Sequence, residues 1–166
     1  ITMTKNIITW DLGGTKCAAG LVKYDEHGSL RCHKTTSVKL ANVTSLHELI
    51  ETIEHNLAVR HHEVDAISIG AAGIYNGNIL RLENSYPFSM PIAHQAQAHK
   101  WARYFVVHDY VPIICASFYP TLTTLTVHEG TLDPLGRRVA FGIGTGLGLK
   151  DGVLLPHGDI WLGHNE

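Results

Sequence analysis

Two glycine-rich turns are the segments of this sequence best suited to chemistry. Asp11-Leu12-Gly13-Gly14-Thr15 and Gly144-Thr145-Gly146-Leu147-Gly148 each follow an apolar run and lead into another. Such turns can direct successive backbone N–H groups at an anion, and glycine lets a phosphate approach without a Cβ clash. Neither is a P-loop or a dinucleotide fingerprint, because neither has the required glycine spacing. A single turn of this kind is more often a plain hairpin, but two of them, one preceded by Asp, favour phosphate binding.

Two aspartates follow apolar runs and are candidates for roles in phosphoryl transfer. Asp11 stands beside the first glycine turn, where a carboxylate suits Mg²⁺ that is also held by phosphate oxygens, directly or through water. Asp109 follows the run Tyr104–Val107. An aspartate there could accept the proton of a hydroxyl group during phosphoryl transfer. Taken by itself, Asp109 is as readily explained as the N-cap of a helix before Pro112.

The elements that position these residues follow from hydrophobic periodicity and turn signals. The apolar runs predict strands over residues 6–10, 17–22, 64–70, 104–107 and 139–143. Helices are predicted after the capping-box pair Ser45 and Glu48, from Pro91 to Ala102, and from Pro112 to about Leu125. The first helix presents one apolar face, made of Leu46, Leu49, Ile50, Ile53 and Leu57.

Turn signals complete this predicted order of elements. Asn76-Gly77-Asn78 predicts a tight turn, and Asp151-Gly152 predicts a hairpin turn. Small residues at 70–73 permit close backbone approach. Strands first, then alternating helices and strands, indicate an α/β protein.

Composition excludes several classes of protein. The chain has 166 residues, a net charge of −2, 45% hydrophobic and 17% charged residues, so an intrinsically disordered chain is excluded. A pI near 6.7 and the absence of basic runs argue against nucleic acid and membrane surfaces as partners. No apolar stretch approaches the ~20 residues of a membrane span, and the N-terminus lacks the layout of a signal peptide.

Cysteine and histidine usage adds an expectation about compartment and metals. Three widely spaced cysteines fit reduced thiols in a cytoplasmic protein better than a disulfide framework. The twelve histidines show no recognised ligand spacing, so surface imidazoles are favoured over a metal site built by the protein.

The motifs together resemble bacterial sugar kinases of the glucokinase and ROK type, within the hexokinase–actin–Hsp70 ATPase superfamily. Residues 10–22 are similar to the first phosphate motif of that family, and residues 142–148 to the second. Residues 69–73 match its small-residue turn, residues 83–86 fall where an Asn-containing element meets the sugar, and Val107–Tyr110 falls where the family has Asn-Asp. The resemblance runs through the whole chain in the right order.

The resemblance implies a fold, a reaction and a set of site residues. The fold would be a ribonuclease H-like (actin-like ATPase) domain with a mixed sheet and flanking helices over residues 1–111. The beginning of a second, similar domain would follow over residues 112–166. The reaction would be transfer of the γ-phosphoryl group of ATP, with Mg²⁺, to a hexose hydroxyl, with glucose giving glucose 6-phosphate as the first expectation.

The resemblance also implies a role for each site residue. Asp109 would be the catalytic base, and Asp11 would orient Mg²⁺. Phosphates would be held by Gly13, Gly14, Thr15, Lys16, Gly144, Thr145 and Gly146. Sugar hydroxyls would be held by Asn84, His108, Asp109 and Glu166.

The sequence departs from the family pattern in ways that leave alternatives open. His108 stands where the family has Asn, and Glu166 matches the family's sugar-binding Glu only with a small insertion. The rest of the adenosine-binding domain and the cysteine-rich zinc motif of many ROK proteins are absent, so the chain resembles the N-terminal portion of a longer kinase. A sugar-responsive transcription regulator and a non-catalytic remnant are the rival interpretations. Family members are often dimers, which makes a homodimer an expectation.

Overall fold

The computed structural model describes residues 4–82, 89–120, 122–143 and 147–163, which form two compact units, Ile1–Asp109 and Tyr110–Glu166. The strands of the first unit are β1 (Lys5–Leu12), β2 (Lys16–Tyr24), β3 (Leu30–Lys39), β4 (Ala66–Ala71), β5 (Gly73–Tyr75), β6 (Leu80–Leu82) and β7 (Tyr104–His108). Its helices are α1 (Leu46–Leu57), α2 (Ile92–Ala98) and short 3₁₀ turns at Leu40–Asn42 and His61–Glu63. The second unit contains α3 (Tyr110–Ser117), β8 (Arg138–Ile143), β9 (Leu147–Leu154) and β10 (Ile160–Leu162). Within these described ranges, no helix has the length and apolarity to cross a membrane.

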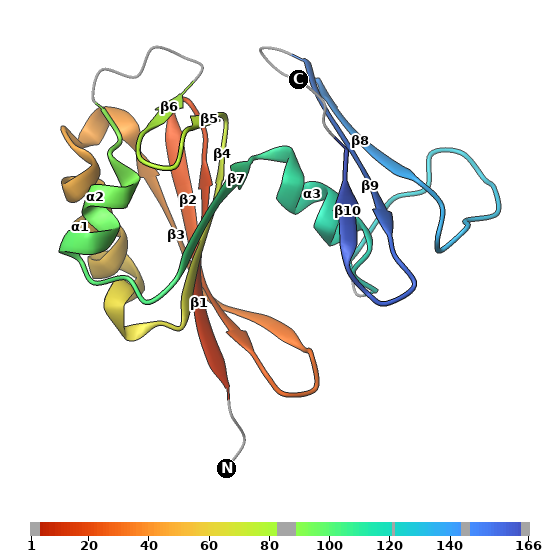
Figure 1. Ribbon diagram of the computed structural model, residues 1–166, viewed down its shortest axis with the longest axis horizontal. Coiled ribbons are helices and arrows are strands. Elements are labelled where there is room, and N and C mark those ends of the chain that lie inside the picture. Colours follow the sequence, from red (N-terminus) through yellow and green to blue (C-terminus); the bar gives the residue numbers. More distant parts are fainter. Residues whose placement is uncertain (1–3, 83–88, 121, 144–146, 164–166) are drawn as a thin grey trace. The chain divides into compact units, whose positions relative to one another are not determined.

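A five-stranded mixed sheet, in the order β3-β2-β1-β4-β7, is the centre of the first unit. The strands β1, β4 and β7 run parallel, whereas β2 and β3 join them as an antiparallel meander. The helices α1 and α2 lie against one face of this sheet (Figure 1). The predicted α/β class, with a mixed sheet and flanking helices, is confirmed.

The helix α1 begins and packs as its sequence predicts. Ser45 Oγ accepts a hydrogen bond from Glu48 N at 3.1 Å, while the Glu48 carboxylate accepts one from Thr44 N at 2.7 Å. The carboxylate therefore reaches one residue before the N-cap, and this backbone hydrogen bond lowers the pKa of Glu48. All five residues of the predicted apolar face are buried.

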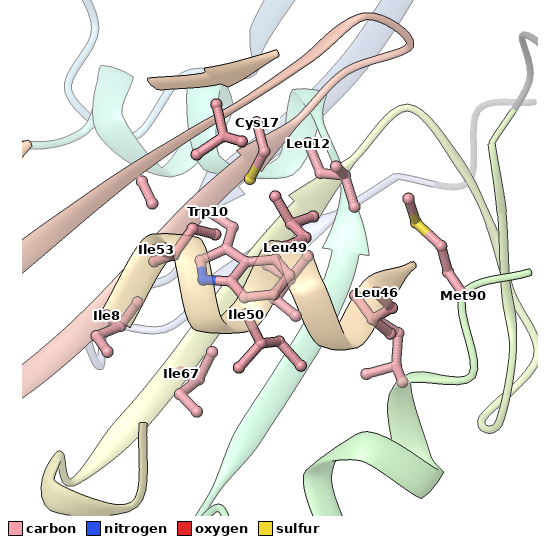
Figure 2. Packing of buried hydrophobic residues seen from close by; sticks show 14 of the residues in the cluster. Ile8, Trp10, Leu12, Cys17, Leu46, Leu49, Ile50, Ile53, Ile67 and Met90 are labelled. Atoms are coloured by element: carbon pink, nitrogen blue, oxygen red, sulfur yellow. The ribbon is translucent and has the colours of Figure 1, made fainter. Parts of the chain in front are cut away.

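The hydrophobic core lies between α1 and the sheet. On β1 and β4, the paired residues Ile8 and Ile67, and Trp10 and Ile69, are all buried on the helical side. Figure 2 shows the apolar side chains of α1 lying over these strands. The buried face of the sheet and the single apolar face of the helix together fix the position of β1 and β4, whose ends carry candidate site residues.

Two predicted helices have different limits in the structure. The helix α2 ends at Ala98 rather than Ala102, because Lys100 adopts a left-handed conformation with φ of 53° and Trp101 N bonds back to Ala96 O at 2.9 Å. The helix α3 ends at Ser117 rather than near Leu125. It also begins earlier, at Tyr110, so that Pro112 falls in the first turn, where its missing N–H costs nothing.

The predicted hairpin turn at Asp151-Gly152 is wrong, because β9 runs straight through both residues. Asp151 is buried and its carboxylate is paired with the Arg137 guanidinium. A Cβ on Gly152 would lie 2.6 Å from Ile114 Cγ2, so glycine here permits α3 to approach the strand. Contacts with α3 and Arg137 therefore override a local turn signal.

An unpredicted buried ion-pair network connects the end of α1 to the following 3₁₀ turn. Glu54 Oε1 accepts a hydrogen bond from the backbone N–H of His61 at 2.9 Å and lies 2.9 Å from His61 Nδ1. The second oxygen, Oε2, is 3.2 Å from Arg60 Nη1. The His61 ring is fully buried, stacks on Trp101 with ring centroids 5.2 Å apart, and meets the edge of Trp10.

Because His61 is buried in this network, we expect the free energy of unfolding to fall in mildly acidic solution. Burial lowers the pKa of His61, and nearby His99 adds to this effect, which outweighs the opposing contribution of Glu54. Below about pH 6.5, the ordinary histidine pKa, the unfolded chain therefore binds a proton that folded His61 does not. The free energy of unfolding should fall as the pH falls from 7 to 5, by up to about 1.4 kcal/mol per pH unit from this group. Urea unfolding at a series of pH values measures this slope.

His61→Gln should make that slope shallower, whatever it does to stability at pH 7. The matched control is His33→Gln, at an exposed position of β3, which should leave the slope unchanged. Glu54 acts at lower pH: burial alone would raise its pKa, but the hydrogen bonds and charges of His61 and Arg60 reverse this and lower it. Equal slopes in the wild type and His61→Gln would contradict the assignment.

Candidate active site

The carboxyl ends of three parallel strands bring Asp11 and Asp109 to one edge of the sheet. In the register, Asp11 pairs with Gly70 of β4, and Gly70 pairs with Val107 of β7. Asp109 follows β7 directly, and its backbone N–H donates to Ala71 O at 3.1 Å. Only β4 separates the two strands, so their backbones are about 10 Å apart. In open α/β sheets, ligands bind outside the carboxyl ends of such strands.

The Asp109 carboxylate is half-buried and partly unsatisfied. Its side chain is 27% exposed, and atom Oδ1 is buried without a hydrogen-bond partner among the described residues. His108 Nδ1 lies 3.0 Å from this oxygen without the geometry of a hydrogen bond. A buried carboxylate oxygen normally accepts a hydrogen bond, and since none of the described residues donates one to Oδ1, this atom can accept a proton or a hydrogen bond from a hydroxyl group. Asp109 directly precedes α3, which begins at Tyr110.

The first glycine turn joins β1 to β2 and is held by two backbone hydrogen bonds. Gly13 N donates to Lys16 O at 3.0 Å, and Leu40 N donates to Thr15 O at 2.9 Å. A Cβ on Gly13 would meet Lys16 O at an ordinary 3.6 Å. The fold itself therefore tolerates a Cβ at Gly13. Gly14 is half-buried in the same turn.

Asp11 is exposed at the end of β1, on the sheet face opposite the buried Trp10. Its partner in the neighbouring antiparallel strand is Ala18, next to the buried thiol of Cys17. Burial raises the pKa of Cys17 well above its usual range, and the Asp11 charge adds to the shift. Cys17 is thus a protonated packing residue rather than a nucleophile.

The predicted small-residue turn after β4 has a demonstrable steric cause at Gly73. A Cβ at this position would collide with the backbone of Arg81 and lie 2.9 Å from Leu82 Cα. The hairpin of β5 and β6 can therefore form only because Gly73 has no side chain. This hairpin, with its turn at residues 76–79, directly precedes the segment predicted to meet the sugar.

Five of the predicted site residues lie outside the residues that the structure describes, namely Asn84, Gly144, Thr145, Gly146 and Glu166. His108 is exposed at the end of β7, beside Asp109. Across the part of the chain that is described, no three or more His, Cys, Asp or Glu side chains gather as metal ligands.

In the second unit, the strands that flank the predicted second phosphate turn form an antiparallel pair. Ile143 of β8 pairs with Leu147 of β9. Gly142 and Gly148 also pair, and a Cβ on either would collide with the Tyr110 ring of α3. These two glycines are therefore explained by the close packing of α3 on the strands rather than by a ligand.

Comparisons with known proteins identify the family. The family model described as Glucokinase matches residues 8–164, whereas no curated protein sequence matches the chain. The fold is similar to that of a glucokinase from an Antarctic psychrotroph, with a TM-score of 0.73 and 18% identity over 96% of this chain and 50% of that one. It is also similar to glucokinase from Balamuthia mandrillaris in complex with glucose (TM-score 0.60, 17% identity, 97% of this chain and 48% of that one).

A third similar structure is a ROK family glucokinase from Streptomyces griseus in complex with glucose and AMPPNP. Its TM-score is 0.56 and its identity 22%, over 97% of this chain and 47% of that one. The chain thus spans about half the length of these solved structures. The likeness confirms the predicted actin-like ATPase fold. Since the family model matches nearly the whole sequence, the chain belongs to the glucokinase family.

Proposed function

We propose that this chain contributes the catalytic base and one phosphate-binding turn to an ATP-dependent sugar kinase. The observation that carries the proposal is the half-buried Asp109 carboxylate at the carboxyl edge of the parallel strands, with His108 beside it and no hydrogen-bond partner for Oδ1 among the described residues. Asp11 and the turn at residues 13–16 lie at the same edge. Membership of the glucokinase family supports a sugar as the acceptor.

Asp109 acts as the general base in this proposal. It accepts the proton of a sugar hydroxyl while the hydroxyl oxygen forms a bond to the γ-phosphorus of ATP and the bond from that phosphorus to the bridging oxygen breaks. The products are a sugar phosphate and ADP. Phosphoryl transfer depends chiefly on positioning and charge stabilisation, so the rigid attachment of Asp109 to β7 and to Ala71 O suits the role.

The two glycine turns bind the phosphates of the nucleotide in this proposal. In the first, Gly13 and Gly14 leave room for phosphate oxygens, and the exposed side chains of Thr15 and Lys16 can add a hydroxyl donor and a positive charge. Residues 144–146 are proposed as the second turn. The Streptomyces griseus enzyme, in complex with AMPPNP, supports an adenine nucleotide as the donor.

Asp11 fits a role toward Mg²⁺. Magnesium usually takes one or two carboxylates and keeps several waters, so a single exposed aspartate beside a phosphate turn matches its chemistry without a protein-built cage. When bound, the ion neutralises charge on the transferring phosphates. Asp11 would hold the ion or its water while residues 13–16 hold the phosphate oxygens.

Sugar hydroxyls are assigned to Asn84, His108, Asp109 and Glu166. Glucose is the proposed substrate, supported by the glucose complexes of the Balamuthia mandrillaris and Streptomyces griseus enzymes. His108 lies beside the proposed base Asp109 and can donate or accept a hydrogen bond, which supports its assignment to a sugar hydroxyl.

The active enzyme is proposed to need more polypeptide than this chain. The strands β8 and β9 expose Phe141, Ile143, Leu147 and Leu149 on one face, each at least 48% accessible. Phe141 pairs with Leu149, and Ile143 with Leu147, which makes the apolar surface continuous. A contiguous exposed apolar face is typical of a surface that another segment covers. Together with a match to half the length of similar kinases, it supports the two predicted domains, 1–111 and 112–166, with the second incomplete.

A hexose panel tests the proposal. The complete enzyme, assayed with MgATP and glucose, mannose, fructose, galactose and N-acetylglucosamine, should phosphorylate glucose with the highest kcat/KM. The 166-residue chain alone should show no ATP-dependent phosphorylation. Turnover by the chain alone would refute the incomplete second domain. Sugar binding without turnover by the complete enzyme would favour a sugar-responsive regulator, and neither binding nor turnover would favour a remnant.

A further inference from the structure

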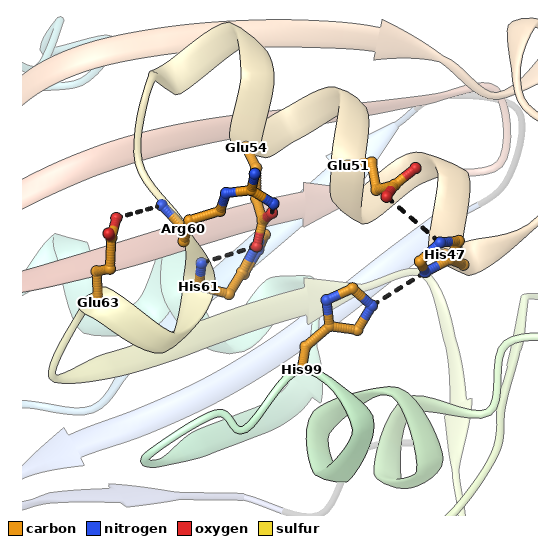
Figure 3. Close-up of polar contacts among 7 residues, drawn as sticks. All are labelled: His47, Glu51, Glu54, Arg60, His61, Glu63 and His99. Atoms are coloured by element: carbon orange, nitrogen blue, oxygen red, sulfur yellow. Dashed lines mark hydrogen bonds and ion pairs between the residues drawn. The ribbon is translucent and has the colours of Figure 1, made fainter.

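A pair of histidines on the two helices that cover the sheet is brought together by the tertiary fold. His47 lies in the first turn of α1, and His99 is the C-cap residue of α2. His47 Nδ1 and His99 Nε2 are 3.1 Å apart, and the ring centroids are 5.1 Å apart with an angle of 41° between the planes (Figure 3). The two residues are 52 positions apart in sequence, so no local spacing motif reveals them.

The separation of the two nitrogens matches that of two ligands on one metal ion. Zinc–imidazole bonds of about 2.0–2.1 Å place two nitrogens about 2.9 Å apart at a right angle and about 3.4 Å apart at the tetrahedral angle. The observed 3.1 Å lies between these values. The same distance also suits an N–H···N hydrogen bond, in which one ring nitrogen carries the proton. An ion bound to both nitrogens would replace that hydrogen bond and stand to one side of the line between them, since two Zn–N bonds in line would need about 4.1 Å. His99 would then carry its own proton on Nδ1.

Glu51 provides a second observation that favours a metal ligand. It lies one turn after His47 on α1, and its Oε1 is 3.4 Å from His47 Nε2. A carboxylate beside Nε2 favours the tautomer of His47 that carries its proton on that nitrogen, and in this tautomer the Nδ1 lone pair is free to bind an ion. Metal-ligating histidines usually have such a partner on the other ring nitrogen, which fixes the tautomer and the ring orientation. Figure 3 shows Glu51, His47 and His99 in this order.

We propose that His47 and His99 form a two-histidine site for a late first-row divalent ion such as Zn²⁺, which links α1 to α2. Imidazole is the ligand type that suits Zn²⁺, Ni²⁺ and Cu²⁺, and it discriminates against the hard ions Mg²⁺ and Ca²⁺. Both rings are accessible to solvent, His47 with 54% of its side chain exposed, so an ion can enter and water can complete its coordination. With two protein ligands, the site binds more weakly than three- and four-ligand zinc sites.

Titration of the metal-free 166-residue chain with Zn²⁺ by isothermal calorimetry tests the site. We expect saturable binding of one ion per chain that Mg²⁺ does not displace. His47→Gln and His99→Gln should each weaken binding at least ~10-fold, and Glu51→Gln by ~10–100-fold, the usual range for loss of a carboxylate behind a histidine ligand. The matched control is His55→Gln, exposed on the same helix two turns further on, which should leave the affinity unchanged.

A second measurement does not depend on variants. In the wild-type chain, substoichiometric Cu²⁺ should broaden the ring resonances of His47 and His99 before those of the other ten histidines. Uniform broadening of all twelve rings, an absence of saturable Zn²⁺ binding, or equal affinity in the wild type and both histidine variants would overturn the proposal and leave a plain hydrogen bond between the rings.

Discussion

Replacing Asp109 by Asn is expected to lower kcat of the complete enzyme by ~10²–10⁴-fold, the usual contribution of a general base, while sugar affinity stays within a few-fold of normal. Asn keeps the size of the side chain and can still hydrogen-bond a sugar hydroxyl, but it cannot accept the proton. The backbone bond from Asp109 N to Ala71 O does not involve the side chain, so the end of β7 should keep its structure.

The control is Asp25→Asn, the same chemical change in the turn between β2 and β3. Asp25 Oδ1 accepts hydrogen bonds from the N–H groups of His27 and Ser29, which an Asn oxygen can also accept. Turnover should be unchanged in this variant. Glucose affinity is measured by calorimetry, and kcat by a coupled assay for ADP. Near-normal turnover of Asp109→Asn would show that Asp109 is not the general base.

Ile53→Ala is expected to destabilise the first unit by about 2–5 kcal/mol, the range for large-to-small substitutions in a packed core. Ile53 is fully buried on α1 within the cluster that holds the helix against the sheet. The loss combines the transfer free energy of the missing methyl and methylene groups with the cost of the cavity. Because α1 backs the strands that end at the site, the variant should also lose activity at temperatures where the wild type is folded.

Ile53→Val provides the graded control and should cost only about 0.5–1.5 kcal/mol. Urea unfolding followed by the fluorescence of Trp10 and Trp101, both buried in the first unit, reports on this core. The Ile53 variants are made in a protein that also carries Trp161→Phe, which removes the tryptophan fluorescence of the second unit. Equal losses in the Ala and Val variants would show that the cavity around Ile53 does not determine stability.

Local signals in the sequence predicted a large part of the fold. The cap at Ser45 and the apolar face of α1 act within a few residues, so periodicity was sufficient to place that helix. Asp11 and Asp109 could be predicted to stand at strand ends because both follow apolar runs, and the parallel pairing in the structure brings these ends to one edge. The glycine turn at 13–16 joins two strands, as predicted.

The errors have two causes, which are contact between residues far apart in sequence and an unusual local backbone conformation. Asp151-Gly152 has the composition of a hairpin turn, but Arg137 pairs with the buried carboxylate and Ile114 occupies the space above the glycine. The early end of α2 depends on the left-handed conformation of Lys100, a residue type that gives no such signal.

The sequence also gave little indication of the polar contacts on the helical side of the sheet. Glu54 lies beside the apolar face of α1, and its burial is intelligible only with His61 and Arg60 in place. The pairing of His47 with His99 depends on how two helices pack, so a search for ligand spacing along the chain does not find it.

The proposed phosphorylation of a sugar by ATP is best tested by ³¹P NMR of the complete enzyme with MgATP and glucose. The γ-phosphate signal should be replaced by equal amounts of ADP and a sugar phosphate esterified at the 6-hydroxyl, with kcat in the range of about 1–100 s⁻¹ that is typical of kinases. Release of inorganic phosphate without a sugar phosphate, or unchanged ATP with every hexose tested, would contradict it.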